Sequence, residues 1–258
     1  MMLDFKRSIL LACGSAAALS LAACSGGETA TTEKGATTTS TTLEQIAPPA
    51  GKKWTEVVSR TPAGNYIMGN PDAKVKLIEY GSLTCSHCAD FSKTSGELES
   101  KYVDSGQVSF EFRNFLLNPF DVSLSLLARC SGPERYFPLT ANIFASQEDI
   151  FKGIQASDQN ALKNIEALPA NDRPGAIAKT AGIDKFMKAR GMSDAEIKQC
   201  LADPSKDMDA LMKNNEEAQS KYQLAGTPHF VLGEQPFELN RGSPGWDQVK
   251  AKLDEALN

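Results

Sequence analysis

The sequence predicts an α/β domain that is interrupted by a large inserted helical subdomain. Strand-like segments occur only near residues 54–115 and 228–239, at the two ends of the folded region. The intervening segment, residues 121–224, has a helical pattern instead. A crossover between parallel strands needs only about a dozen residues, whereas this connection is about a hundred residues long. We therefore interpret the connection as an insertion, and the flanking segments as a small fold of packed layers.

In the first part of the α/β domain, residues 51–120, each element has its own signal. Three strand-like segments precede the insertion: 54–58, 75–80 and 108–115. The second is the clearest, because Asn70-Pro71-Asp72 and Gly81-Ser82 bound it on both sides. A helix is expected to follow it, as far as about residue 102. Its apolar residues form one stripe at helical spacing, namely Cys88, Phe91, Leu98 and Tyr102.

The insertion and the second part of the domain are marked by turns and by a return of strand character. Turn signals divide the helical insertion, at Gly132-Pro133, Pro169-Ala170-Asn171-Asp172 and Gly191. Two further strands are expected at 228–232 and 235–239, and a last amphipathic helix at 245–257. Residues 225–258 therefore complete the α/β domain.

The composition limits the kind of protein this is. A chain of 258 residues allows one large domain or two small ones. The apolar fraction of 41% is slightly below the globular average, which indicates that part of the chain does not fold. The net charge is −5 and no basic stripe is present, so we expect no nucleic-acid partner.

Residues 1–23 are expected to be a signal peptide. Lys6 and Arg7 precede an apolar run that is too short to span a bilayer. The run closes with Leu21-Ala22-Ala23-Cys24, which resembles the bacterial lipobox. The resemblance implies that Cys24 is lipidated, and that the protein is periplasmic and anchored to the membrane by this lipid. The alternative is an ordinary signal peptide that is cut near Ala23.

Residues 24–50 have the composition of a flexible tether. They are rich in Thr, Gly, Ala and Ser, and they end in Pro48-Pro49 before the folded region. Such a stretch buries too little apolar surface to offset the entropy lost on ordering. It does not resemble an oligomerising strand, which favours a monomer.

The motif Cys85-Ser86-His87-Cys88 directly follows a strand and opens a helix. Cysteines at i and i+3 lie about one turn apart, which allows a disulfide between them. The first sits at the helix N-terminus, where free N–H groups favour a thiolate, and the second joins the apolar stripe. We therefore expect Cys85 to be the exposed nucleophile and Cys88 the resolving thiol. His87 adds a donor beside the same thiolate.

Two alternatives for this motif are half of a zinc site and an inert structural disulfide. Zinc requires two further ligands, but the only other histidine is His229. Cys130 and Cys200 are isolated, with no second C-x-x-C. No bound metal is therefore expected.

The segment from Lys76 to Cys88 resembles the active-site segment of the DsbA family of disulfide oxidoreductases. The resemblance covers about residues 52–258. It implies a thioredoxin fold with no cofactor, acting on unfolded or reduced exported proteins and reoxidised by a quinone-linked thiol oxidase in the membrane. One difference stands out, because the family's best-known oxidase has proline where this chain has Ser86.

The resemblance also implies roles for three residues outside the motif. In the family, a cis proline before a strand lies against the active-site disulfide; Pro228 fits it, and Thr227 would then pair with an extended substrate. Without the resemblance, a trans proline that starts a strand is an equal alternative. The family also places a buried acid below the resolving cysteine, which corresponds to Glu79 and would exchange a proton with Cys88. The alternative is a solvated carboxylate at the strand end.

Cys130 and Cys200 both lie in the helical insertion. Of the six cysteines, those at 13 and 24 belong to the signal segment, which leaves four in an oxidising compartment. We expect Cys130 and Cys200 to form a structural disulfide, and the arrangement is similar to that of some members of the family. A second redox centre is the alternative.

The function that follows is a thiol–disulfide oxidoreductase that introduces disulfides into exported proteins. Stabilising the Cys85 thiolate stabilises the reduced enzyme and makes its disulfide a stronger oxidant. Two alternatives stay open at this point. One is a reductase or isomerase of the same fold, and the other is a non-catalytic lipoprotein that binds clients and uses the disulfide as a staple.

Overall fold

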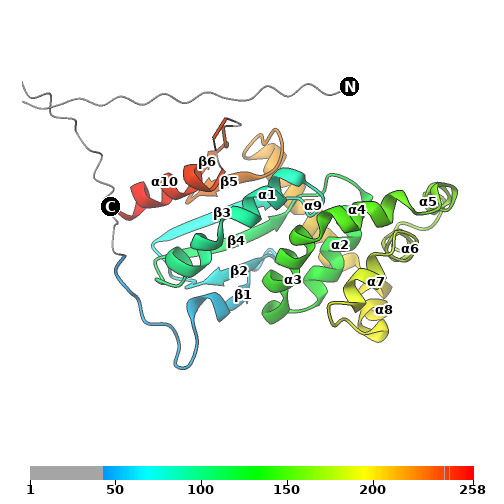
Figure 1. Cartoon of the computed structure of the whole chain (residues 1–258), viewed down its shortest axis with the longest axis horizontal. Helices are drawn as coiled ribbons and strands as arrows, with labels where there is room; N and C mark the ends of the chain where they lie inside the picture. Colours follow the sequence, from blue (N-terminus) through cyan, green and yellow to red (C-terminus); the bar gives the residue numbers. More distant parts are fainter. Residues whose placement is uncertain (1–42, 241, 244) are drawn as a thin grey trace, which may run out of the picture. The chain divides into compact units, whose positions relative to one another are not determined.

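A computed structural model describes residues 43–240, 242–243 and 245–258 of the chain (Figure 1). The expected signal peptide 1–23, the lipidation site Cys24 and the tether up to residue 42 lie outside the described residues.

The described chain is built around one six-stranded sheet (Figure 1). Its strands are β1 (Val58–Arg60), β2 (Tyr66–Gly69), β3 (Val75–Gly81), β4 (Val108–Asn114), β5 (His229–Leu232) and β6 (Gln235–Phe237). Their order across the sheet is β1-β2-β4-β3-β5-β6. Strands β3 and β4 are parallel, and the other neighbours are antiparallel.

The central strand β3 is buried on both faces except at Lys76, near its start, which agrees with its mainly apolar sequence. Leu77 contributes to the larger hydrophobic core on one face. Ile78 and Tyr80 contribute to a smaller core on the opposite face, which also includes Ala218 of the helix α9 (Ser205–Ser220). The sheet is thus covered on both sides, and β3 carries its C-terminal end to the middle of the molecule.

The helix after β3 is shorter than the sequence pattern predicts. Helix α1 (Ser86–Thr94) ends well before residue 102, and a separate π-helix, η2 (Leu98–Val103), follows. The Thr94 hydroxyl donates to the carbonyl oxygens of Asp90 (3.2 Å) and Phe91 (3.1 Å). Such side-chain bonds to the preceding turn, together with Gly96, weaken the continuation of a helix.

The insertion between β4 and β5 is entirely helical, as expected. Its helices are α2 (Pro119–Cys130), α3 (Pro133–Ala145), α4 (Gln147–Gln155), α5 (Gln159–Ile165), α6 (Arg173–Thr180), α7 (Ile183–Lys188), α8 (Asp194–Ala202) and α9. The predicted turn at Gly132 separates α2 from α3, and Gly132 adopts a positive φ of 86° that favours glycine. The last helix, α10 (Gly245–Leu257), packs against α1 and β3 as the final element of the α/β domain.

The first strand is placed differently from the prediction. Residues Trp54–Glu56 form a 3-10 helix, η1, and the strand begins only at Val58. The Trp54 indole is buried, and its N–H donates to the carbonyl oxygen of Ile46 (2.8 Å). The Val57 N–H donates to the carbonyl oxygen of Trp54 (3.0 Å), which closes a local turn in place of an extended edge strand. Strand β2 was not predicted at all.

Residues 43–50, which were expected to belong to the tether, contact the folded domain. The Leu43 side chain is buried in the main core. The Ile46 N–H donates to the carbonyl oxygen of Ser105 (2.8 Å). These contacts tie the last residues of the expected tether to the domain.

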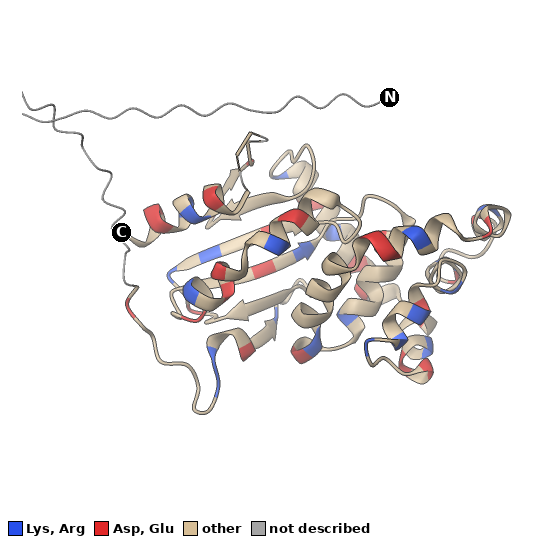
Figure 2. Cartoon of the chain, viewed as in Figure 1, with Lys and Arg blue, Asp and Glu red and all other residues tan. Residues whose placement is uncertain are grey.

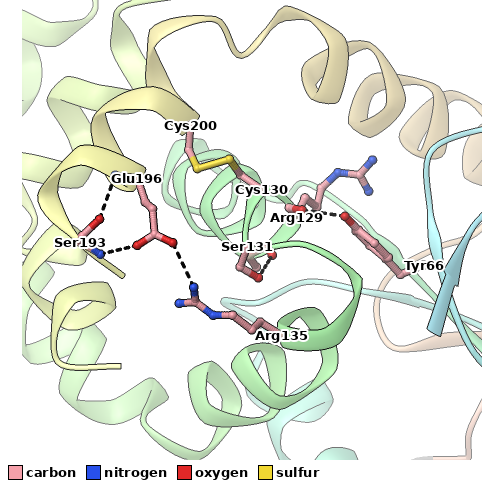
Figure 3. The surroundings of a disulfide bond; sticks show 9 residues. Tyr66, Arg129, Cys130, Ser131, Arg135, Ser193, Glu196 and Cys200 are labelled. Carbon is pink, nitrogen blue, oxygen red and sulfur yellow. Dashed lines mark hydrogen bonds and ion pairs between the residues drawn. A yellow bond between two sulfur atoms is a disulfide. The ribbon is translucent and has the colours of Figure 1, made fainter. Parts of the chain in front are cut away.

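A disulfide joins Cys130 at the end of α2 to Cys200 in α8 (Figure 3). The surrounding contacts also link elements that are distant in sequence. Arg135 pairs with Glu196 of α8 (3.2 Å), and the Tyr66 hydroxyl donates to the carbonyl oxygen of Arg129 (2.8 Å). The disulfide thus fastens one end of the insertion to a helix 70 residues later.

Replacing both Cys130 and Cys200 by serine is expected to lower the free energy of unfolding by about 4 kcal/mol, because the reduced chain regains the entropy of a long loop. Urea denaturation of the two proteins measures this difference. Exchange activity per folded molecule should stay the same, since neither cysteine belongs to the C-x-x-C motif. Loss of activity in a variant that is still folded would instead favour a second redox centre.

Candidate active site

The turn between β3 and α1 presents the two cysteines of the motif unequally. The Cys85 N–H donates to the carbonyl oxygen of Ser82 (3.1 Å), which closes the turn. Cys85 is then the N-cap of α1, with an extended backbone (φ −87°, ψ 122°). Its side chain is half-buried, whereas that of Cys88, one turn later, is completely buried. Only Cys85 is therefore accessible to another protein.

The surroundings of Cys85 favour its thiolate. A hydrogen bond from the Cys88 thiol, together with the backbone N–H groups of Cys88 and His87, lowers the pKa of Cys85 to about 5, against the opposing effect of burial. Cys85 is therefore largely ionised at neutral pH. The contribution of His87 to this effect comes from its backbone N–H, and its side chain is exposed.

Cys88 is held in the protonated form. Burial raises the pKa of Cys88 well above its ordinary value, and the neighbouring Cys85, and Glu79 when it is ionised, raise it further. The two thiols of one motif thus have opposite protonation states at neutral pH. This difference separates an attacking thiol from a resolving thiol.

Glu79 lies in the interior, as the buried-acid interpretation requires. Its side chain is only 3% exposed, and no described residue bonds its Oε1 atom. Burial, followed by the charge of Cys85, raises the pKa of Glu79 to about 8. The carboxyl borders a cavity of about 100 Å³ that it shares with Phe112 and Thr140. Glu79 is therefore a buried acid that titrates near neutral pH.

The loop before β5 brings Thr227 and Pro228 beside the motif. The peptide bond between them is cis. Cys85 Sγ lies 3.3 Å from the Thr227 carbonyl oxygen, to which the protonated thiol donates, and this contact joins residues 142 positions apart. A groove of about 420 Å³ opens at this point, and its wall includes His87, Pro228 and His229.

Two residues of the site were not predicted from the sequence. Asp121, near the start of α2, is fully buried and bonds the turn before Cys85. Gln147, the first residue of α4, donates to the carbonyl oxygen of Cys85 (3.0 Å). The only local signal was Asn118-Pro119, which is typical of a helix start and indicates nothing about the partner of Asp121.

The other predicted features lie elsewhere. Cys130 and Cys200 belong to α2 and α8 and are paired with each other. Within the described chain, no cluster of three or more His, Cys, Asp or Glu side chains is placed to hold a metal ion. None of the described helices combines the length and apolarity that a membrane span requires. Figure 2 shows basic and acidic residues interspersed along the helices rather than gathered into stripes.

The chain is similar to known thiol–disulfide oxidoreductases in sequence and in structure. The family model described as thioredoxin matches residues 61–255. A relative from Rickettsia bellii, whose name places it among protein-disulfide oxidoreductases, is 28% identical over 83% of this chain and 73% of its own. A solved structure named as a protein-disulfide isomerase, from Novosphingobium aromaticivorans, is 29% identical with a TM-score of 0.66, covering 74% of this chain and 96% of its own.

A second solved structure, Wolbachia pipientis alpha-DsbA1, resembles the chain in fold. It is 20% identical with a TM-score of 0.56, and the match covers 80% of this chain and 96% of that protein. These likenesses confirm the predicted fold class, an α/β domain of thioredoxin type with inserted helices.

Proposed function

Because this chain belongs to the thioredoxin family and is a DsbA-like thiol–disulfide oxidoreductase, we propose that it introduces disulfides into exported proteins through Cys85 and Cys88. The observation that carries this direction is the opposite protonation of the two thiols. The reduced form gains a stabilised Cys85 thiolate, with its pKa lowered to about 5. Stabilising the reduced form makes the corresponding disulfide a better oxidant.

The reaction begins from the Cys85–Cys88 disulfide. A client thiolate attacks Cys85 Sγ, the bond between the two enzyme sulfurs breaks, and the electron pair leaves with Cys88. A second thiolate of the client then attacks the client sulfur of the mixed disulfide and expels Cys85 as a thiolate. The client loses two electrons and gains a disulfide, and the enzyme gains them as a dithiol. The low pKa of Cys85 suits the second step, because a more acidic thiol is a better leaving group.

Glu79 supplies the proton that the first step requires. Cys88 leaves in an interior where burial disfavours its anion, so it must be protonated as it departs. Burial, the main cause of the raised pKa of Glu79, is present in the disulfide form as well, so Glu79 can hold a proton there and act as a general acid toward Cys88. In reoxidation the same carboxylate acts as the base.

The groove beside the cis peptide bond receives the client. The carbonyl oxygen of Thr227 already lies within bonding distance of Cys85 Sγ, so backbone atoms of an extended client pair there next to the attacked sulfur. The groove wall formed by His87 and Pro228 contacts the residues that flank the client cysteine.

The remaining partners follow from the chemistry. Each cycle leaves the enzyme as a dithiol, so an external oxidant has to accept two electrons, and we propose a quinone-linked thiol oxidase in the membrane. Lipidation at Cys24 would hold a monomeric enzyme at the periplasmic face of that membrane.

A reductase or isomerase is the second candidate. It is favoured by Ser86, which replaces the proline of the strongest oxidants, and by the isomerase name of the similar Novosphingobium protein. A non-catalytic staple is disfavoured by the family and by the half-exposed position of Cys85.

The proposal is tested by titrating the thiolate absorbance of the reduced protein and measuring its equilibrium with glutathione. We expect a thiolate that titrates near pH 5 and an oxidising couple that restores activity to a reduced, unfolded test enzyme. A pKa near the ordinary value of about 8.5, with a potential below about −300 mV, would contradict the oxidase. Reshuffling of scrambled disulfides without net oxidation would favour the isomerase.

A further inference from the structure

The Asp121 carboxylate, which belongs to the inserted helix α2, binds the turn that ends at Cys85. Its side chain is fully buried. The Thr84 N–H donates to Oδ1 (3.0 Å), and the Leu117 N–H donates to Oδ2 (2.9 Å). Each carboxylate oxygen is therefore committed to a backbone donor.

Hydroxyl groups complete this arrangement. The Ser82 hydroxyl lies 2.9 Å from both oxygens of Asp121, and the Thr84 hydroxyl donates to Oδ2 (2.9 Å). Thr84 is the residue directly before Cys85, and the Ser82 carbonyl oxygen accepts the Cys85 N–H. The carboxylate thus holds both residues that define the turn.

A second side chain of the insertion holds the other side of Cys85. The Gln147 side-chain N–H group donates to the carbonyl oxygens of Leu83 (3.0 Å) and Cys85 (3.0 Å). The backbone on both sides of the nucleophile is therefore fixed by α2 and α4 rather than by the α/β domain alone.

We propose that Asp121 is a positioning residue, which acts through Thr84 to keep Cys85 where its thiolate is favoured. The inference rests on the proposed role of Cys85 as the attacking thiol. The Cys85 sulfur gains its N–H partners only at the N-cap of α1, so a turn that is released at Thr84 loses them. The helical insertion then takes part in the chemistry, because it sets the position of Cys85.

The carboxylate is essential to this role, and an amide of the same size is not a substitute. In Asp121→Asn, either orientation of the amide places its NH₂ group against a backbone N–H, of Thr84 or of Leu117. One orientation leaves the buried Leu117 N–H without its acceptor, and the other leaves the Thr84 N–H with only the Ser82 hydroxyl oxygen (3.1 Å), so the turn is loosened in either case. A charge effect has the opposite sign, because removal of a negative charge would favour the Cys85 thiolate.

The experiment compares Asp121→Asn with the wild-type chain and with Asp104→Asn as the matched control. Asp104 Oδ1 accepts from the Thr55 N–H (3.0 Å) and hydroxyl (2.9 Å), which an amide oxygen does equally well, and it lies at a different turn of the domain. In each protein the thiolate midpoint of Cys85 and the equilibrium constant with glutathione are measured. For Asp121→Asn we expect the midpoint to rise by about one unit and the disulfide to become tenfold less oxidising, or about 30 mV. Asp104→Asn should leave both values unchanged.

Several results would overturn the proposal. A folded Asp121→Asn variant with wild-type midpoint and equilibrium constant would show that the carboxylate only stabilises the fold. A lowered midpoint would show that its charge matters instead of its bonds. Should the variant fail to fold, Thr84→Val keeps the N–H and removes one of the bonds to Asp121, together with the bond that the Thr84 hydroxyl accepts from the Asn118 side chain (2.7 Å). We expect a smaller shift in the same direction, and no shift would refute the proposal.

The two hypotheses fail separately in this experiment. The wild-type midpoint alone tests whether Cys85 is an activated thiol. The difference between variant and wild type tests Asp121, whatever the wild-type value is.

Discussion

Replacing Cys88 by alanine is expected to abolish turnover and to leave the enzyme trapped in mixed disulfides through Cys85. The reduced variant still has an accessible thiolate, because Cys85 is half-buried and carries the lowered pKa, although that pKa should rise when the Cys88 thiol is removed. Its attack on a client disulfide expels one client thiolate and forms a mixed disulfide. Without Cys88 no internal thiol resolves that bond. Clients should therefore be recovered as covalent adducts from an extract of exported proteins, on a non-reducing gel.

Cys85→Ala is the matched control for this trap. It keeps the same number of thiols, but the remaining one, on Cys88, is completely buried and has its pKa raised well above the ordinary value. This variant should form almost no adducts. Equal amounts of adduct through Cys88 would contradict the assignment of the attacking and resolving thiols, and adducts in neither variant would argue against both enzymatic functions.

Replacing Glu79 by glutamine is expected to stabilise the reduced protein while slowing the reaction. The pKa of Glu79 is about 8 in the folded protein and near 4.5 in the unfolded chain. Between pH 4.5 and pH 8, Glu79 is protonated in the folded state but ionised in the unfolded chain. The stability of the folded state therefore falls as the pH rises through this range. The difference between the two pKa values of Glu79 lowers the free energy of unfolding by at most about 5 kcal/mol above pH 8. Denaturation with urea should show the variant to be more stable by a few kcal/mol at pH 8 and little changed at pH 4.5.

Glu111→Gln provides the control for stability. Glu111 is also largely buried, but it pairs with Arg113 (2.7 Å). Removing its charge leaves a cation with a weaker partner, so this variant should be less stable than the wild type. A Glu79→Gln variant that loses stability in the same way would show that the pKa of Glu79 is not raised in the folded protein.

The activity of Glu79→Gln separates proton transfer from stability. Loss of a general acid typically costs about a hundredfold or more in rate. The wild-type rate of client oxidation should fall as the pH rises and Glu79 loses its proton, whereas the variant should be slow with a flat profile. A variant with the wild-type rate and profile would remove Glu79 from the mechanism.

Features that depend only on neighbouring residues could be predicted from the sequence. The strand 75–80, the helix start at Cys85 and the spacing to Cys88 are all encoded within 14 residues. Alternation and helical periodicity act over the same short range, and they located β4, β5, β6 and α10. The inequality of the two thiols was predictable for this reason, because the helix end and the apolar stripe are local.

Which distant groups meet around that motif depends on the tertiary structure. Asp121 and Gln147 reach the turn from 37 and 62 positions away, through helices whose own sequences carry no sign of the partner. Strand β2 and the 3-10 turn at Trp54 likewise depend on what they pack against. Local patterns state how a segment folds but not where it is placed. The burial that raises the pKa of Glu79, and the bonds that hold Cys85, arise only when the insertion closes over the end of the sheet.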